Sequence, residues 1–341
     1  MRRWLGRASM VASANFPDNN AKTGHSGRRV EETAMIICCG EALIDMLPRA
    51  TTRGEDAFAP YAGGAVFNTA IALGRLGLPT GFLTGLSSDM FGDILRKVLT
   101  ESGVDHSYCA TLDLHTTLAF VRLVNGQASY AFIDENTAGR MLTEAHLPAL
   151  GGDVEALHFG AISLIPDPCG STYESLMRRE CGSRVISLDP NIRPGFITDP
   201  AKHRARIDRM IAMSDILKMS DEDLEWFGMT DMESAAKVWL DNGPSLVVFT
   251  RGPKGAVGFT RDGRVEVEGV PVTVADTVGA GDTFNAGILA SLKRDGVLDK
   301  TAIRSLSVDA IGNALSLGAR AAAVTVSRPG ANPPWANEIG F

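Results

Sequence analysis

The chain has 341 residues, of which 45% are apolar and 21% are charged, and its 33 basic and 40 acidic side chains give a net charge of −7. This composition excludes a disordered, collagen-like or membrane-spanning protein, because no uncharged apolar run reaches the roughly 18 residues that a spanning helix needs. The excess of acidic residues argues against sequence-independent binding to nucleic acid or to an anionic membrane, since both require a positive surface.

The cysteines and histidines argue against disulfides and against zinc. The five cysteines are scattered and form no CxxC pair, and the six histidines form no HExxH motif. We therefore expect neither a disulfide framework nor a zinc site, and a reducing cytoplasm is the predicted location. Cys38 and Cys39 are neighbours in an apolar run, so in a strand their side chains should point to opposite faces of the sheet.

The first 34 residues differ from the rest of the chain. They are polar, lack periodicity and contain no continuous apolar segment, which argues against a secretory signal. We expect residues 1–34 to be a disordered extension, or the product of an upstream start codon. Met35 would then open a single folded domain over 35–341.

From residue 36 onward, short apolar strands alternate with amphipathic helices. The pattern predicts a strand at 36–39, a helix at 66–76 before Gly77, a strand at 81–84, and a helix at 91–102 before Gly103. Further strands are expected at 157–159, 185–188, 216–217 and 246–250, and helices at 170–181, 201–213 and 233–242. Such alternation predicts an α/β fold with a doubly wound, mostly parallel sheet covered on both faces.

One segment interrupts this alternation. Residues 118–133 contain two extended runs joined at Asn125-Gly126, which is a strong hairpin signature. The hairpin lies between α/β units, so it indicates a small β-sheet that projects from the main body. A routine surface hairpin is the competing interpretation.

A glycine-rich segment near the carboxyl end carries the strongest indication of chemistry. The chain lacks the GxxxxGK[ST] motif, has no GxGxxG after its first strand and has no GxSxG motif. Residues 275–284 instead read ADTVGAGDTF and lead into a helix expected at 283–294. Small residues let backbone N–H groups approach a ligand, and a helix start adds unpaired donors, so this segment predicts a phosphate site. Asp282 is either a proton acceptor there or a simple helix N-cap.

A second glycine pair precedes the helix expected at 66–76. Gly63 and Gly64 come before this helix, and Asn68 falls in its first turn. Backbone amides and an amide side chain are groups that a polyhydroxyl ligand needs. A tight turn before a helix explains the same residues without a ligand.

These two segments together resemble the signatures of the ribokinase-like (PfkB) carbohydrate kinases, in the same order and at a similar separation. The resemblance spans residues 36 to about 335. The segments GEALIDM (40–46), DPNIR (189–193), KMSDED (218–223) and DENTAGR (134–140) are most similar to those of bacterial fructokinases. The resemblance implies a ribokinase-like sheet with a small β-sheet lid, formed mainly by about 112–135.

The resemblance also implies roles for individual residues. Asp282 would be the general base, and the N–H groups of Gly279, Ala280 and Gly281 would hold the transferred phosphoryl group. The implied sugar-binding residues are Asp45, Gly63, Gly64, Asn68 and Arg193. The implied nucleotide-binding residues are Thr250 and Gly252, with Ser220 and Asp223 where the family has Asn and Glu near magnesium and the phosphates. The implied potassium loop consists of Asp276 and the carbonyls of Val278, Thr325, Arg328 and Gly330.

The activity that the resemblance implies is transfer of phosphate from ATP to D-fructose, giving fructose 6-phosphate with Mg²⁺. The helix start is expected to lower the pKa of Asp282, and a loose transition state tolerates such a weak base. A 2-keto-3-deoxygluconate kinase, for which Arg122 and Arg193 are the candidate cations, and a ribokinase are alternatives. A non-catalytic sugar- or nucleotide-binding regulator and an NAD-dependent dehydrogenase rank lower. A homodimer formed through the lid hairpin is a further hypothesis.

Overall fold

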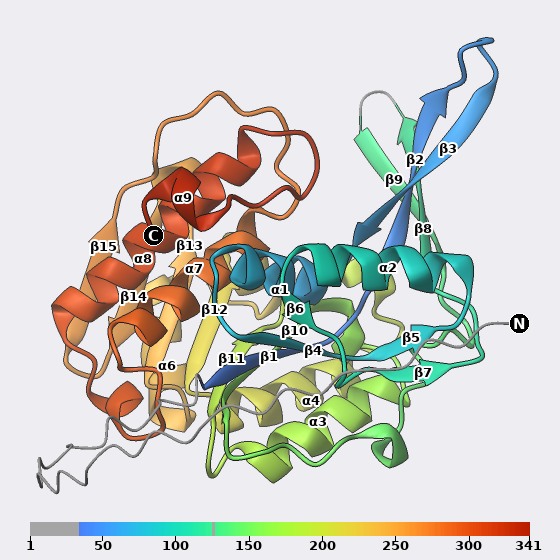
Figure 1. Ribbon diagram of the computed structural model, residues 1–341. Helices are drawn as coiled ribbons and strands as arrows, with labels where there is room; N and C mark the ends of the chain where they lie inside the picture. The colour runs from blue at the N-terminus through green and yellow to red at the C-terminus, as the bar shows by residue number, and fades with distance from the viewer. Residues whose placement is uncertain (1–33, 125–126) are drawn as a thin grey trace, which may run out of the picture. The chain divides into compact units, whose positions relative to one another are not determined.

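The computed structural model describes residues 34–124 and 127–341, and these described residues form one compact unit (Figure 1). The expected extension at 1–34 and the Asn125-Gly126 turn lie outside the described residues, apart from residue 34. Within the described residues, no helix is both long and apolar enough to cross a bilayer.

A nine-stranded sheet forms the centre of this unit, in the order β15-β14-β13-β12-β11-β10-β1-β4-β6. Neighbouring strands from β13 to β6 run parallel, whereas β14 and β15 are antiparallel additions at one edge. The predicted mostly parallel sheet is therefore confirmed. Its strands are β1 (Met35–Cys39), β4 (Thr80–Leu83), β6 (Val104–Asp105), β10 (Val154–Gly160), β11 (Val185–Asp189), β12 (Ile216–Ser220), β13 (Leu246–Thr250), β14 (Ala256–Thr260) and β15 (Gly263–Val267).

Helices cover both faces of the large sheet (Figure 1). The sheet therefore separates two layers of apolar core, one between the sheet and each set of helices. One layer holds α1 (Ala65–Arg75), α2 (Met90–Glu101), α7 (Ala280–Arg294) and α8 (Val308–Val326). The other holds α3 (Cys169–Glu180), α4 (Pro200–Met213), α5 (Asp221–Trp226) and α6 (Met232–Asn242), and the short α9 (Ala336–Ile339) follows α8. Cys38 packs in the first layer and Cys39 in the second, as predicted for adjacent strand residues.

Helix α7 is largely enclosed by the rest of the fold. Every residue from 282 to 292 is buried, because its side chains are small or apolar on all sides. Its contact with α8 depends on two glycines: a Cβ on Gly287 would lie 2.5 Å from the Cα of Gly318. The carboxyl-terminal helices thus hold the start of α7 firmly against the sheet.

A second, four-stranded sheet has the order β3-β2-β8-β9 and projects from the main body (Figure 1). Its strands are β2 (Leu43–Ala50), β3 (Asp56–Gly63), β8 (Leu118–Val124) and β9 (Gln127–Ile133). The predicted hairpin at 118–133 supplies only half of it, so the expected origin of the lid mainly at about 112–135 was too narrow. Pro48 and Pro60 interrupt the strand patterns of β2 and β3, which explains why the sequence pattern did not reveal them. The remaining strands of the described residues, β5 (Gly85–Ser87) and β7 (Ala110–Leu112), form a separate two-stranded sheet.

The carboxyl ends of the parallel strands gather the polar residues that matter below. Glu41 follows β1, and Asp189, Ser220 and Thr250 are the last residues of β11, β12 and β13. The chain leaves β1 toward β4 on one side and later returns to β10 on the other, so β1 and β10 flank a topological switch point. Ligands of open α/β sheets bind at such a point.

Candidate active site

The two glycine-rich segments meet at the starts of α1 and α7. The side-chain amide of Asn68 donates to Oδ2 of Asp282 over 2.9 Å, and the Thr69 hydroxyl donates to the Asp282 carbonyl over 3.2 Å. Both Asn68 and Asp282 are at least nine-tenths buried. The segments that the sequence singled out separately therefore form one site.

The start of α7 leaves backbone donors available. Gly279 is the N-cap residue and has a φ of +78°, a conformation that favours glycine, and no side chain caps the helix. Asp282 lies inside the first turn, so the N-cap interpretation of Asp282 was wrong and the helix begins three residues earlier than expected. Among the described residues, none accepts from the N–H of Gly279 or Gly281, and the N–H of Ala280 has only a long 3.4 Å contact with the Thr277 carbonyl. These donors suit an anion.

The pKa of Asp282 departs from the expectation. Burial raises it from 3.8 to about 7; the nearby carboxylates of Asp189 and Glu41 raise it further, while the Asn68 hydrogen bond and the Lys218 charge lower it. The prediction that the helix start would lower this pKa was wrong, because the loss of solvation outweighs the helix dipole. A carboxylate with a pKa near neutrality is a stronger base than an ordinary aspartate.

Asp45 and the glycine pair continue the site. Asp45 lies in β2 opposite Tyr61, and a Cβ on Gly63 would lie 2.3 Å from Oδ2 of Asp45, so a larger residue there would displace the Asp45 carboxylate. Burial raises the pKa of Asp45 to about 6. Gly64 is the N-cap of α1 with a φ of +112°. A continuous run of contacts thus joins Asp45 to Asp282 through the start of α1.

Glu41 belongs to this site and was not predicted individually. Its Oε1 accepts from the N–H of Ala65 at the start of α1 over 2.8 Å, and its Oε2 accepts from the N–H of Ser163 over 3.3 Å. Burial raises its pKa to about 7 although these hydrogen bonds lower it. These two hydrogen bonds connect the segment after β1 to the start of α1 and to the turn after β10. The position of Glu41 directly after a buried strand and before the glycine pair was the available indication.

A cavity of about 570 Å³, here named the acceptor cavity, opens next to Glu41. Phe132 of the small sheet and Phe196 of the main body line it, and their ring centroids are 4.5 Å apart. Other lining residues include Thr117, Asp134, Arg140, Ser163 and Lys202. Arg193, predicted to bind substrate, is exposed, donates to the carbonyl of Ile192 over 3.0 Å and does not line the cavity.

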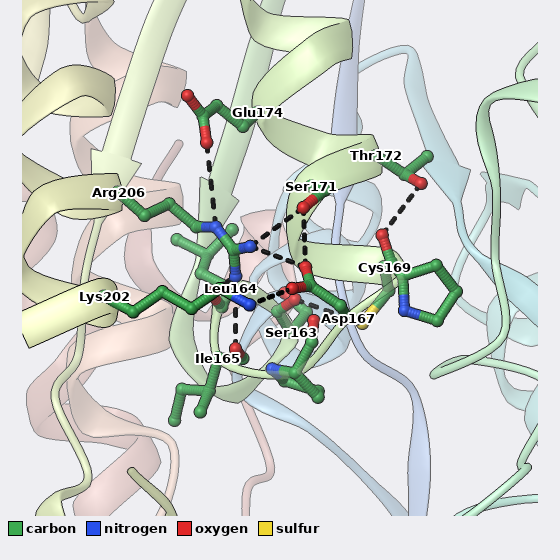
Figure 2. Close-up of polar contacts among 12 residues, drawn as sticks. Ser163, Leu164, Ile165, Asp167, Cys169, Ser171, Thr172, Glu174, Lys202 and Arg206 are labelled. Carbon is green, nitrogen blue, oxygen red and sulfur yellow. Dashed lines mark hydrogen bonds and ion pairs between the residues drawn. The ribbon is translucent and has the colours of Figure 1, made fainter. Parts of the chain in front are cut away.

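A polar cluster supports the floor of the acceptor cavity (Figure 2). Arg206 of α4 is 3% exposed and donates to the Leu164 carbonyl over 2.8 Å and to Asp167 over 2.6 Å. Lys202 reaches the same carboxylate over 2.6 Å, and Glu174 of α3 lies 3.7 Å from Arg206. The cluster fastens α3 and α4 to the loop that follows β10.

A second cavity, of about 550 Å³, lies on the other side of the α7 start, and we name it the nucleotide cavity. The predicted residues Thr250, Gly252, Ala280 and Gly281 line it. The sequence did not predict its apolar walls, which come from the segment before α7 and from α7 and α8: Val270, Pro271, Val272, Val274, Phe284, Ala319, Ala322, Ala323 and Val326. Such walls suit a flat heterocyclic base, and the donors at residues 279–281 suit its phosphates.

The side chains of the predicted residues Ser220 and Asp223 are hydrogen-bonded to each other. Oδ2 of Asp223 accepts from both the N–H and the hydroxyl of Ser220 over 2.7 Å, and Oδ1 accepts from the N–H of Ile192 over 2.7 Å. Asp223 therefore joins the ends of β11 and β12. The described residues contain no group of three His, Cys, Asp or Glu side chains that could hold a metal ion.

Asp276, predicted to belong to a potassium loop, connects two segments of the chain. Its Oδ1 accepts from the N–H of Val278 over 3.1 Å, and its Oδ2 accepts from the N–H of Gly330 over 2.9 Å. This carboxylate joins the segment before α7 to the segment after α8. Of the predicted carbonyls, that of Thr325 lies in the last turn of α8 and accepts from the N–H of Arg328 over 3.1 Å. Backbone carbonyls are the oxygen donors that potassium prefers.

Comparison with known proteins identifies the family. The model of the pfkB family carbohydrate kinases matches residues 33–338. The chain belongs to this family. Its predicted enzyme class, an ATP-dependent carbohydrate kinase, and its predicted ribokinase-like fold are thereby confirmed.

Individual members of the pfkB family are also similar to the chain. A fructokinase from Rhizobium leguminosarum bv. trifolii is 65% identical over 280 residues, which cover 82% of this chain and 86% of the relative. The structure of a fructokinase with bound ATP from Xylella fastidiosa is 29% identical, with a TM-score of 0.79, covering 88% of this chain and 94% of the other. A fructokinase double mutant from Vibrio cholerae O395, in a form with fructose, ADP and potassium ion bound, is 25% identical, with a TM-score of 0.77 and coverage of 88% and 94%.

Proposed function

We propose that this pfkB family kinase transfers the terminal phosphoryl group of ATP to D-fructose, giving fructose 6-phosphate. The observation that carries the proposal is the Asn68–Asp282 pair, since it joins the sugar-side residues to a helix start that faces the nucleotide cavity. The 65% identity to a fructokinase over most of both chains supports fructose as the acceptor. Both agree with the sugar predicted from the sequence.

The geometry supplies a simple reaction path. Asp282 takes the proton of the sugar hydroxyl while that oxygen forms its bond to the terminal phosphorus, and the bond from phosphorus to the ADP oxygen breaks. The N–H groups of Gly279, Ala280 and Gly281 stabilise the charge on the transferred group. Phosphoryl transfer needs little covalent chemistry from a protein, so positioning and charge stabilisation account for most of the catalysis.

The sugar-side residues position the acceptor. Asp45 and Asn68 offer a carboxylate and an amide to hydroxyl groups, and Gly63 leaves room for the Asp45 carboxylate. We infer that the four-stranded sheet acts as the lid, since Phe132 of this sheet lines the acceptor cavity. A lid that excludes water protects ATP from hydrolysis. The same sheet is the proposed contact of a homodimer.

We also propose Mg²⁺ and K⁺ as the cations. The absence of a three-carboxylate cluster among the described residues fits a Mg²⁺ ion that binds mainly to the phosphates, which is its usual mode at nucleotide sites. When bound, Mg²⁺ would neutralise phosphate charge. Because both oxygens of Asp223 already accept hydrogen bonds, Asp223 and Ser220 would act on the ion through water. The carbonyls around Asp276 would hold K⁺ beside the start of α7.

A substrate panel tests the proposed function. ADP formation by the purified enzyme is measured with fructose, ribose and 2-keto-3-deoxygluconate, and the phosphate position of the product is read by NMR. Fructose should give the highest kcat/KM, with phosphate on the C6 oxygen. A higher kcat/KM for either of the other acceptors would contradict the proposal, and preference for the keto acid would favour a role for Arg193.

A further inference from the structure

A buried lysine from the sheet reaches the phosphoryl site. Lys218 of β12 is 4% exposed, and its Nζ donates to Oδ2 of Asp189 on the neighbouring strand over 3.1 Å. Asn285 of α7 donates to the same Asp189 oxygen over 2.7 Å. The lysine, the aspartate and the asparagine therefore connect the carboxyl ends of β11 and β12 to the first turns of α7.

The ammonium group lies directly beside the backbone donors of α7. A Cβ on Gly281 would lie 3.3 Å from Nζ of Lys218. The N–H of Gly281 is one of the two that no described residue accepts from. A positive charge and free backbone donors are thus adjacent at the start of α7, where Ala280 and Gly281 line the nucleotide cavity.

The hydrogen bonds of this ammonium group are incomplete. An ammonium group has three N–H donors. Across the described residues, Asp189 is the only acceptor for Lys218. Burying a charged donor without a partner is costly, so two unfilled donors in the middle of a site indicate an anionic ligand.

Lys218 stays protonated although it is buried. Burial alone would lower its pKa, but the carboxylates of Asp189, Asp223 and Asp282 outweigh burial and raise the pKa above its ordinary value. Three carboxylates facing one cation would repel a polyphosphate. Lys218 is the cation that offsets this repulsion next to the transferred group.

We propose that Lys218 is a catalytic residue that donates to the transferred phosphoryl group of ATP, while Asp189 and Asn285 hold it in position. The proposal rests on the kinase reaction proposed above, but it does not depend on which sugar accepts the phosphate. It adds a side-chain cation to a site otherwise built from backbone N–H groups. A purely structural role, in which Lys218 only neutralises buried Asp189, is the alternative to exclude.

The test separates these two roles by removing the charge of Lys218 alone or together with the charge of its partner Asp189. Lys218→Met alone leaves Asp189 unpaired and is expected to lower the melting temperature. The double variant K218M/D189N removes both charges, and its stability should approach that of D189N alone. Lys300→Met is a matched control, since Lys300 contacts the buried Asp215 over 2.6 Å in another part of the fold.

The readouts are the Kd values of AMP and of the non-hydrolysable ATP analogue AMPPNP with Mg²⁺, together with kcat. Relative to D189N, the double variant should bind AMPPNP about 10–100-fold more weakly, as expected for a charged hydrogen bond, and AMP within about twofold. The kcat of the double variant should fall about 100-fold. Lys300→Met should change neither the Kd of AMPPNP nor kcat by more than about twofold.

A double variant with the AMPPNP affinity and kcat of D189N would overturn the assignment of Lys218 and leave it a structural role. Failure of the proposed function would look different. In that case the wild-type enzyme would phosphorylate none of the sugars, while the AMPPNP comparison would still decide whether Lys218 contacts the terminal phosphate.

Discussion

Asn68 and Asp282 are separated by 214 positions in the chain, yet the amide of Asn68 donates to Oδ2 of Asp282 over 2.9 Å. The bond orients the carboxylate and leaves Oδ1 without a donor among the described residues. Oδ1 is therefore the oxygen that we expect to take the proton of the sugar hydroxyl. This contact links the residues proposed to hold the sugar to those proposed to hold the phosphate.

Removing the Asn68 amide should leave the Asp282 carboxylate poorly oriented and should raise its pKa. The kcat/KM of the wild-type enzyme should fall below pH about 7, the pKa to which burial raises Asp282. The Asn68 hydrogen bond lowers this pKa, so Asn68→Ala should move the acid limb to higher pH and reduce kcat/KM about 10–100-fold. Asn313→Ala, at an exposed position on α8, is the control. An unchanged acid limb in N68A would argue against the pairing.

The raised pKa of Asp282 also makes stability depend on pH. Its stabilising contribution is complete below the unfolded-state pKa of 3.8 and is lost as the pH rises through the folded-state value of about 7. Asp282→Asn carries no such loss, so its melting temperature relative to the wild type should be higher at pH 8 than at pH 5. Thermal denaturation of both proteins at the two pH values measures this. A difference between the two proteins that is independent of pH would refute the assigned shift.

Substitution of Gly63 should weaken binding of the sugar and leave binding of the nucleotide nearly unchanged. A Cβ at this position would lie 2.3 Å from Oδ2 of Asp45, so Gly63→Ala should displace the carboxylate and raise the KM for fructose about 10–100-fold. The KM for ATP should change by less than about threefold. Gly182→Ala is the matched control, because nothing lies within 4 Å of a Cβ there. Equal effects on both KM values would show that the change is not confined to the sugar side.

The cluster below the acceptor cavity should contribute stability. Arg206→Met removes a buried guanidinium that donates to Asp167 and to the carbonyls of Leu164 and Ile165 (Figure 2). Loss of hydrogen bonds from a charged donor costs about 1.5–3 kcal/mol. Lys97→Met, in an exposed pair with Glu101 at 3.8 Å, should cost about 1 kcal/mol or less. Denaturant unfolding of both variants measures the difference, and comparable losses would contradict the role of the cluster.

The sequence revealed those parts of the fold that depend on local pattern. Strands such as Leu246–Thr250 and helices such as Pro200–Met213 follow from apolar periodicity and capping residues, and they were located within one or two residues. The glycine-rich segments could be recognised because they must keep side chains away from a ligand. Both levels of information lie within short windows of the chain.

What the sequence did not reveal depends on contacts between distant segments. Burial of Asp282 by α1 and the sheet raises its pKa, whereas reasoning from the helix start alone predicted the opposite shift. The apolar walls of the nucleotide cavity come from α8 and from an irregular segment, and neither has a pattern typical of a nucleotide site. Lys218 lies just past the strand expected at 216–217, and only pairing of β11 with β12 places it beside Asp189.

Turnover of Asp282→Asn with fructose and ATP tests the central claim most directly. The substitution preserves the shape of the side chain and removes its ability to take a proton, so kcat should fall about 10²–10⁴-fold. Circular dichroism and the Kd of AMPPNP, which should stay within about threefold of the wild-type value, serve as controls for the fold and the nucleotide site. A kcat within about tenfold of the wild type would contradict Asp282 as the base.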